Sequence, residues 1–191
     1  MNETQHKLIL FCGPSGSGKT TIVHHLLENN SQFSFSVSAT TRKKRDNEVH
    51  GKDYYFLSLE EFKSKIKEDE FIEWEEVYES GFYGTLKSEI NRISNLGKHV
   101  IFDVDVEGGL KIKKLFSSSL LAVFVMPPSI EDLKQRLKSR ATETQIDLQN
   151  RLEKAEQELK YSQFFDMVIV NKDLDQSLKE AQNMVEKFLE K

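Results

Sequence analysis

Short apolar runs alternate along the chain with segments in which apolar residues recur every three or four positions. Four runs have the length and the flanking residues of buried strands, at residues 8–12, 99–104, 121–126 and 167–170. Other segments have the period of amphipathic helices, for example 19–28 and 175–191. Strands and helices in this alternation predict an α/β fold with a parallel sheet flanked by helices.

The region from 34 to 89 has a different pattern. Aromatic-rich runs at 53–57 and 71–78 have strand character, and the capping-box sequence Ser58-Leu-Glu-Glu61 begins a short helix between them. We expect this region to form a small α+β lobe inserted into the parallel core, and the polar segment 138–147 to form a helical lid. The whole chain is then one domain, 1–191, whose core comprises residues 1–33, 90–137 and 148–191.

A glycine-rich motif lies between the first predicted strand and the first predicted helix. Gly13-Pro-Ser-Gly-Ser-Gly18-Lys19-Thr20 matches the P-loop pattern G-x-x-x-x-G-K-[ST] in full. Glycines let the backbone turn its N–H groups towards an anion, and the following helix adds the positive end of its dipole. The lysine suits the β- and γ-phosphates of a nucleotide, and the threonine hydroxyl suits Mg²⁺. The predicted ATP-binding residues are Gly13, Pro14, Ser15, Gly16, Ser17, Gly18, Lys19, Thr20 and Thr21.

An apolar run that ends in an acid, His99-Val-Ile-Phe-Asp103, follows further along the chain. Asp103 suits the second Mg²⁺ ligand of a P-loop enzyme beside Thr20, so we expect Mg²⁺ as the cofactor. The alternative is an ordinary turn residue, because many strands end in aspartate. The five histidines and the single cysteine show no metal-ligand spacing, so no other metal site is expected.

Arginine side chains gather in two segments that lie far apart in the sequence. Arg42 and Arg45 lie in the predicted lobe. Arg136 and Arg140 share one face of a predicted helix, and Arg151 follows the predicted lid. Because arginine binds phosphate through two parallel hydrogen bonds, the pattern predicts phosphates held from two sides. Solvated helix charge is the alternative for Arg136 and Arg140.

Composition narrows the choice of function. Charged residues make up 30% of the chain and the net charge is −4, which argues against a nucleic-acid partner. Cys12 is the only cysteine, so no intramolecular disulfide is possible, which suits a reducing compartment. Residues 1–7 are polar, and the apolar run behind them is too short for a signal peptide or a membrane span. We therefore expect a cytoplasmic protein without a membrane partner.

Several blocks along the chain are similar to the sequence signatures of guanylate kinases. They are Ser36-Val-Ser-Ala-Thr-Thr-Arg42 with Arg45 and Glu48, Gly51-Lys-Asp53-Tyr54-Tyr-Phe56, Phe71-Ile-Glu-Trp74, Tyr83-Gly-Thr85, Asp103-Val-Asp105, Arg136 and Arg140 with Thr142-Glu-Thr144, and Val168-Ile-Val-Asn171. The blocks occur in the family's order and span nearly the whole chain, so the chain resembles this family. It departs from the family pattern at Lys44, Asn47, Glu107 and Ala141.

The resemblance implies a P-loop NTPase-type fold and the Mg²⁺-dependent transfer of a phosphoryl group from ATP to GMP, in a monomer or homodimer. It implies dGMP as a further acceptor. The GMP phosphate would be held by Ser38, Arg42, Arg45, Tyr54 and Tyr83, and the guanine by Glu73, Thr85 and Asp105. The catalytic residues would be Lys19, Arg42, Arg136, Arg140 and Arg151, and Asn171 would lie near the ATP base.

The residue types also suit this chemistry. Guanine presents N1–H and N2–H₂ donors that an ionised carboxylate accepts, whereas adenine would leave a buried Glu73 or Asp105 unpaired. Glu73 could instead be an exposed strand residue, because Glu75 and Glu76 are adjacent. The acceptor phosphate has a second pKa of about 6 and is mostly ionised at neutral pH, so no general base is needed.

Three other functions stay open on the sequence alone. A guanylate-kinase-like domain can act as a protein-interaction scaffold, but the complete phosphate cradle argues against this. A kinase could act on another nucleotide or phosphorylated metabolite. A GTPase would need an aspartate at a position that Asn171-Lys172-Asp173-Leu174 does not provide.

Overall fold

The computed structural model describes residues 6–77, 81–117, 119–138 and 145–190, with the backbone alone at 77 and 145–148. The strands are β1 (Leu8–Cys12), β2 (Phe33–Phe35), β3 (Ala39–Thr40), β4 (Tyr55–Phe56), β5 (Phe71–Val77), β6 (Gly81–Leu86), β7 (His99–Val104), β8 (Leu120–Met126) and β9 (Met167–Val170). The helices are α1 (Lys19–Asn29), α2 (Leu59–Lys67), α3 (Lys87–Asn95), α4 (Val106–Phe116), α5 (Ile130–Lys138), α6 (Gln145–Leu159) and α7 (Leu174–Leu189).

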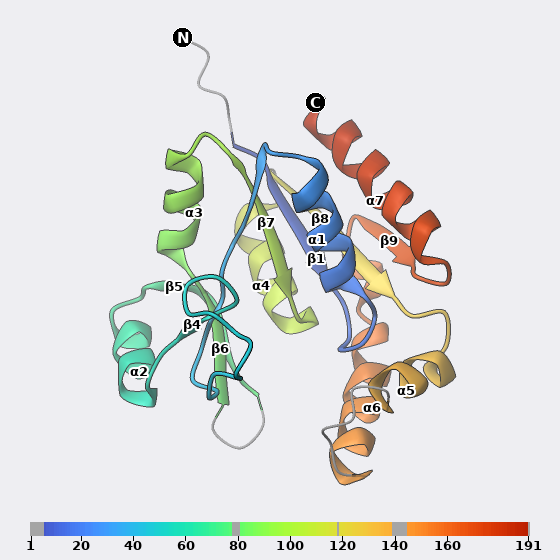
Figure 1. Cartoon of the computed structure of the whole chain (residues 1–191), viewed down its shortest axis with the longest axis horizontal. Helices are drawn as coiled ribbons and strands as arrows, with labels where there is room; N and C mark the ends of the chain where they lie inside the picture. Colours follow the sequence, from blue (N-terminus) through green and yellow to red (C-terminus); the bar gives the residue numbers. More distant parts are fainter. Residues whose placement is uncertain (1–5, 78–80, 118, 139–144, 191) are drawn as a thin grey trace.

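A five-stranded parallel sheet forms the centre of the molecule, in the order β2-β7-β1-β8-β9 (Figure 1). All residues of the middle strand β1 are buried, because helices cover both faces of the sheet. Ile9 and Phe11 pack with side chains of α1 and α7, whereas Leu8 and Leu10 pack with side chains of α3 and α4. The α/β fold predicted from the alternating pattern is therefore confirmed, together with its four predicted strands.

The sequence pattern does not predict the edge strand β2. It pairs with β7, with Phe33 opposite His99 and Phe35 opposite Ile101. Ser34 and Phe35 thus belong to the parallel sheet, although the predicted boundary assigns them to the lobe. The strand is short and its phenylalanines alternate with serine, so its pattern does not differ from that of the region that follows.

A second sheet of four strands, in the order β4-β3-β6-β5, is formed by residues of the predicted lobe (Figure 1). β6 is antiparallel to both β3 and β5, whereas β3 and β4 are parallel. The sheet has a buried cluster of its own, made of Ala39, Phe62, Phe71, Phe82 and Leu86. The two strands predicted here occur in shorter form as β4 and β5, and the structure adds β3 and β6.

The predicted capping box begins α2. The Ser58 hydroxyl accepts a hydrogen bond from the Glu61 N–H (3.1 Å), and the Glu61 carboxylate accepts one from the Ser58 N–H (2.7 Å). The predicted lid falls mostly outside the described residues, which resume at 145 after α5 ends at Lys138. None of the helices, within the part of the chain that the structure describes, is long and apolar enough to cross a membrane.

A buried carboxylate joins the two sheets where the chain passes from one to the other. Glu89, on α3, accepts hydrogen bonds from the Val37 N–H (2.7 Å) and from the Tyr55 hydroxyl (2.9 Å). Arg92 donates to both Glu89 oxygens and to the Phe35 carbonyl. These bonds tie β2, β4 and α3 together, so they hold the second sheet against the end of the first.

Phe62 provides a test of the second sheet's own core. Its buried ring stacks on Phe71 with 4.4 Å between the ring centroids. Phe62→Ala leaves a cavity between α2 and the sheet, so we expect the free energy of unfolding to fall by about 3–5 kcal/mol, measured by urea denaturation. Phe62→Leu, the control, keeps most of the apolar volume and should lose clearly less. Equal stability of wild type and Phe62→Ala would contradict this packing.

Candidate active site

A cleft of about 780 Å³ lies between the carboxyl ends of β1 and β7 and the second sheet. Open α/β sheets bind ligands at this edge, because the loops after adjacent parallel strands meet there. The predicted site residues that line the cleft are Ser15, Lys19, Thr20, Ser38, Arg42, Tyr54, Glu73, Tyr83, Asp103, Asp105 and Arg151. The structure thus brings together residues assigned to the ATP phosphates, the GMP phosphate and the guanine base.

The P-loop follows β1 in a conformation that favours glycine at its turning points. Gly13, Gly16 and Gly18 have φ angles of 149°, 86° and 96°. A side chain at Gly13 would also collide with the neighbouring strand, because its Cβ would lie 2.3 Å from the Val125 carbonyl oxygen. Gly18 is the N-cap of α1, so no side chain caps the first amides of this helix. Uncapped amides at a helix N-terminus bind anions.

Two predicted site residues contact the P-loop backbone and do not line the cleft. Asn171 is buried, and its Nδ2 donates to the Ser17 carbonyl (2.8 Å). Arg136 donates to the same carbonyl (3.2 Å) and to the Asn171 carbonyl (2.8 Å). Contacts of Asn171 with the ATP base and of Arg136 with the transferred phosphoryl group stay predictions. Arg140, predicted for the same helix face as Arg136, lies outside the described residues.

Thr20 and Asp103 meet where β1 and β7 end side by side. Thr20 Oγ1 donates to Asp103 Oδ2 (2.5 Å), and Lys19 Nζ lies 3.9 Å from Asp103 Oδ1. Oδ1 is buried and accepts no hydrogen bond from the described residues. A carboxylate oxygen with unused acceptor capacity, beside a hydroxyl, suits Mg²⁺, which takes few protein ligands and keeps several waters. These side chains therefore fit the expected metal.

Arg42 lies at the centre of a polar cluster after β3. Its guanidinium donates to both carboxylate oxygens of Glu48 (2.9 and 2.7 Å) and to the Tyr83 hydroxyl (3.2 Å), and it lies 5.3 Å from the centre of the Tyr54 ring. Hydrogen bonding to Arg42 lowers the pKa of Glu48 to about 2. The cluster holds a guanidinium and two phenol groups, which are the donors that a phosphate needs.

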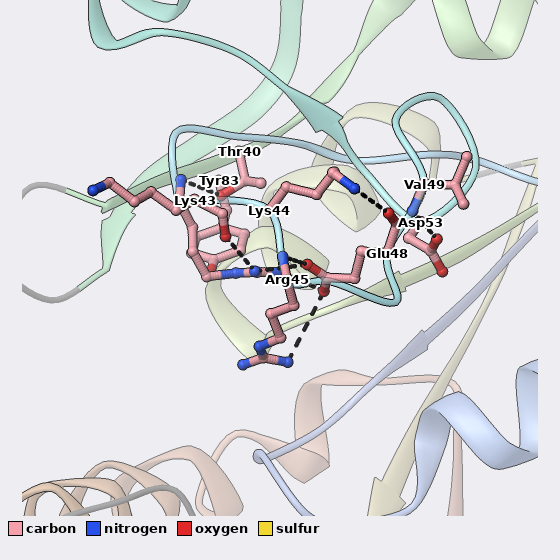
Figure 2. A network of polar contacts seen from close by, with 9 residues as sticks. Thr40, Lys43, Lys44, Arg45, Glu48, Val49, Asp53 and Tyr83 are labelled. Atoms are coloured by element: carbon pink, nitrogen blue, oxygen red, sulfur yellow. Dashed lines mark hydrogen bonds and ion pairs between the residues drawn. The ribbon is translucent and has the colours of Figure 1, made fainter.

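Glu48 also organises the loop that carries Arg45 (Figure 2). Its carboxylate accepts a hydrogen bond from the Arg45 N–H (2.8 Å), and its carbonyl accepts one from Lys44 Nζ (2.9 Å). Lys44, which departs from the family pattern, thus ties the loop through its ammonium group. The Arg45 side chain is 69% exposed and is not among the residues that line the cleft. Its predicted phosphate contact therefore requires the side chain or the loop to move.

Glu73 and Thr85 lie opposite each other on β5 and β6. Both are buried, and the Thr85 hydroxyl donates to Glu73 Oε1 (2.6 Å), so Thr85 orients the carboxylate. Burial raises the pKa of Glu73. A Cβ at Gly108, in the first turn of α4, would lie 2.9 Å from Glu73 Oε2. Asp105 caps the same helix by accepting the Gly108 N–H (2.9 Å), so the two carboxylates flank one glycine.

Sequence reasoning misses three charged residues that line the cleft beside Asp105. Lys154 Nζ, on α6, lies 3.3 Å from Asp105 Oδ2 and 3.6 Å from the carboxylates of Glu75 and Glu158. Burial, and then the hydrogen bond with Asp105, raise the pKa of Glu75, and burial raises the pKa of Glu158 to about 7. The helical spacing of Arg151, Lys154 and Glu158 is the one available signal, because it puts all three on one face.

A family model described as guanylate kinase matches residues 5–188. The chain belongs to the guanylate kinase family. Guanylate kinases of Bacteroides thetaiotaomicron and Porphyromonas gingivalis are 46% and 45% identical to it, over 97% of this chain and 91% and 99% of theirs. A crystal structure of guanylate kinase from Anaplasma phagocytophilum is 30% identical with a TM-score of 0.77, and covers 97% of this chain and 87% of that one. The resemblance inferred from the sequence blocks is confirmed.

The P-loop of this guanylate kinase family member can be tested at Gly13. Gly13→Ala places a methyl group against the Val125 carbonyl, so we expect affinity for Mg·ATP to fall at least about tenfold in calorimetric titration, which corresponds to about 1.4 kcal/mol. Gly97→Ala is the matched control, since Gly97 also has a positive φ (69°) but its Cβ would meet nothing within 4 Å. Unchanged affinity in Gly13→Ala would contradict the cradle geometry.

Proposed function

We propose that this chain catalyses the direct transfer of the terminal phosphoryl group of ATP to GMP, giving ADP and GDP. One observation carries the proposal: a single cleft is lined by the P-loop lysine Lys19 and by the carboxylates of Glu73 and Asp105. The phosphate-binding loop and the carboxylates that would accept hydrogen bonds from the base therefore line the same cleft. Membership in the guanylate kinase family supports this assignment.

The ATP end of the cleft would be formed by the P-loop. The uncapped amides of α1 would bind the phosphates, and the Lys19 ammonium would neutralise charge on the β- and γ-phosphates. Thr20 and Asp103 would hold Mg²⁺, which supplies further neutralisation when it is bound. Asn171 and Arg136 would act on the phosphates indirectly, because their hydrogen bonds to the P-loop backbone keep its amides in place.

The GMP phosphate would bind at Arg42, Tyr54 and Tyr83, with Ser38 on the same wall of the cleft. Arg42 is held by Glu48 before any ligand arrives, so little side-chain entropy is lost when the phosphate binds. Arg45 would join from the loop as the cleft closes. Closure also excludes water, which would otherwise accept the phosphoryl group.

The guanine would be recognised by Glu73 and Asp105, whose oxygens accept hydrogen bonds from N1–H and N2–H₂. Thr85 occupies Glu73 Oε1, which leaves Oε2, beside Gly108, for a donor of the base. Adenine offers no matching donors, so a buried carboxylate would stay unpaired with AMP. Discrimination by such a site reaches about 10⁴–10⁵.

The transfer step needs alignment and charge neutralisation. The acceptor is a phosphate oxygen that is already ionised at neutral pH, so no side chain has to remove a proton. Arg151 lines the cleft from α6 and would approach the transferred group together with Arg136 and Arg140. Because charge spreads over the phosphoryl oxygens in the transition state, cations on several sides favour it over the ground state.

Substrate choice is the first test. In a coupled assay of ADP release we expect turnover with GMP and dGMP, and values of kcat/KM lower by about 10⁴ or more with AMP, UMP and CMP. Lys19→Ala should lower kcat by about 10²- to 10³-fold, whereas Lys179→Ala, at an exposed position of α7, should not. Equal turnover of AMP and GMP would remove the guanine assignment. Mg·ATP binding without any turnover would favour a scaffold.

The metal site is the second test. We expect EDTA to abolish turnover and Mg²⁺ to restore it. Asp103→Asn should raise the Mg²⁺ concentration for half-maximal activity by about ten- to a hundredfold, since it removes a charged ligand. Asp175→Asn, at an exposed residue of α7, is the matched control. An unchanged Mg²⁺ requirement in Asp103→Asn would show that Asp103 does not hold the ion.

A further inference from the structure

Lys154 has carboxylate partners in three different parts of the fold. Glu75 lies on β5 of the second sheet, Asp105 lies between β7 and α4 of the core, and Glu158 lies on α6 itself. The distances from Lys154 Nζ are 3.6, 3.3 and 3.6 Å. The ammonium is therefore the counter-ion at the point where the second sheet, the core and α6 meet.

Besides its hydrogen bond with Glu75, Asp105 has two partners that set its orientation. Its Oδ1 accepts the Gly108 N–H at the start of α4, and its Oδ2 lies against the Lys154 ammonium. The carboxylate torsion of aspartate is otherwise soft, so one partner alone would leave the group free to rotate. With both partners in place, the plane of the carboxylate is held beside Glu73, on the other side of Gly108.

The second partner is also the cation that neutralises Asp105. Glu73, Glu75, Asp105 and Glu158 all line the cleft near Lys154, and Lys154 is the cation within 4 Å of Asp105 among the described residues. Without the ammonium, the partly buried Asp105 carboxylate would lie among acidic side chains with no counter-ion beside it, which is costly away from bulk water. Rotation of the carboxylate towards solvent would relieve that cost, and the ammonium opposes this movement.

We propose that Lys154 is a positioning residue for base recognition: its ammonium holds the Asp105 carboxylate in the orientation that accepts the N–H donors of guanine. The inference rests on the proposed function, since it takes Asp105 as a contact of the base. Lys154 acts through Asp105, and its effect is confined to the base end of the acceptor site. The ATP end and the acceptor phosphate end do not depend on it.

Lys154→Met tests this directly, because methionine keeps the unbranched apolar stem and removes the charge. We expect the KM for GMP to rise about tenfold, which corresponds to a loss of about 1.4 kcal/mol of binding free energy. The KM for ATP and the kcat at saturating GMP should stay within about twofold of wild type. Inhibition by ribose 5-phosphate, which carries the acceptor phosphate without a base, should be unchanged.

Further variants separate positioning from a structural role. Lys154→Arg keeps the charge, so its KM for GMP should stay within about threefold of wild type. The double variant Lys154→Met with Asp105→Asn should have the same KM for GMP as Asp105→Asn alone, because Lys154 acts through Asp105. Lys160→Met changes an exposed lysine just beyond the end of α6 and should have no effect.

The outcomes separate this inference from the proposed function. A wild-type protein that does not phosphorylate GMP would overturn both. If the wild type is active and Lys154→Met keeps its KM for GMP, only the positioning role is overturned. It is also overturned if the KM values for ATP and GMP and the constant for ribose 5-phosphate all rise together, because that pattern indicates a structural defect. Lys154→Gln gives the same readings if the methionine variant does not fold.

Discussion

The parallel pairing of β1 with β7 sets the position of both ends of the cleft. Cys12 lies opposite Val104, so the P-loop leaves its strand beside the residues that lead to Asp105. The same register brings Thr20, in the first turn of α1, to Asp103. Because side chains alternate across a strand, a slip of one residue would turn Asp103 to the other face. Complete burial of β1 prevents that slip, since it would also displace the apolar residues on both faces.

In the proposed binding mode, the charge along the cleft would give GMP one direction. Lys19 and Arg42 supply positive charge towards the P-loop and the phenol groups, whereas Glu73 and Asp105 supply acceptors at the other end. A nucleoside monophosphate has its charge at the phosphate and, in guanine, its donors at the far edge of the base. Reversed binding would place the phosphate against Glu73 and Asp105, and Arg42 would stay paired with Glu48. Electrostatics therefore sets orientation as well as affinity.

The sequence predicts the parts of this structure that depend on local pattern. The buried strands, the P-loop and the capping box at Ser58 follow from short stretches of chain, and the structure confirms them. β2 escapes prediction because three alternating residues carry too little signal, and its pairing with β7 is a tertiary contact. Glu75 and Lys154 are not predicted as cleft residues for a related reason. Their contacts join three elements that meet only in the fold. Arg136 and Asn171 illustrate a third case. Both lie beside the P-loop, as predicted, but their hydrogen bonds go to backbone carbonyls and they do not line the cleft.

The first turn of α4 shows what close approach requires of a helix. Gly108 and Gly109 lie in succession there, although glycine inside a helix is about 1 kcal/mol less favourable than alanine. A methyl group at Gly108 would meet Glu73, and one at Gly109 would lie 3.0 Å from the Cys12 Cβ. Replacing helical glycine by alanine is a common route to thermostable variants. In this turn the exchange would force Glu73 or Cys12 to shift, because the helix approaches both side chains more closely than a Cβ allows.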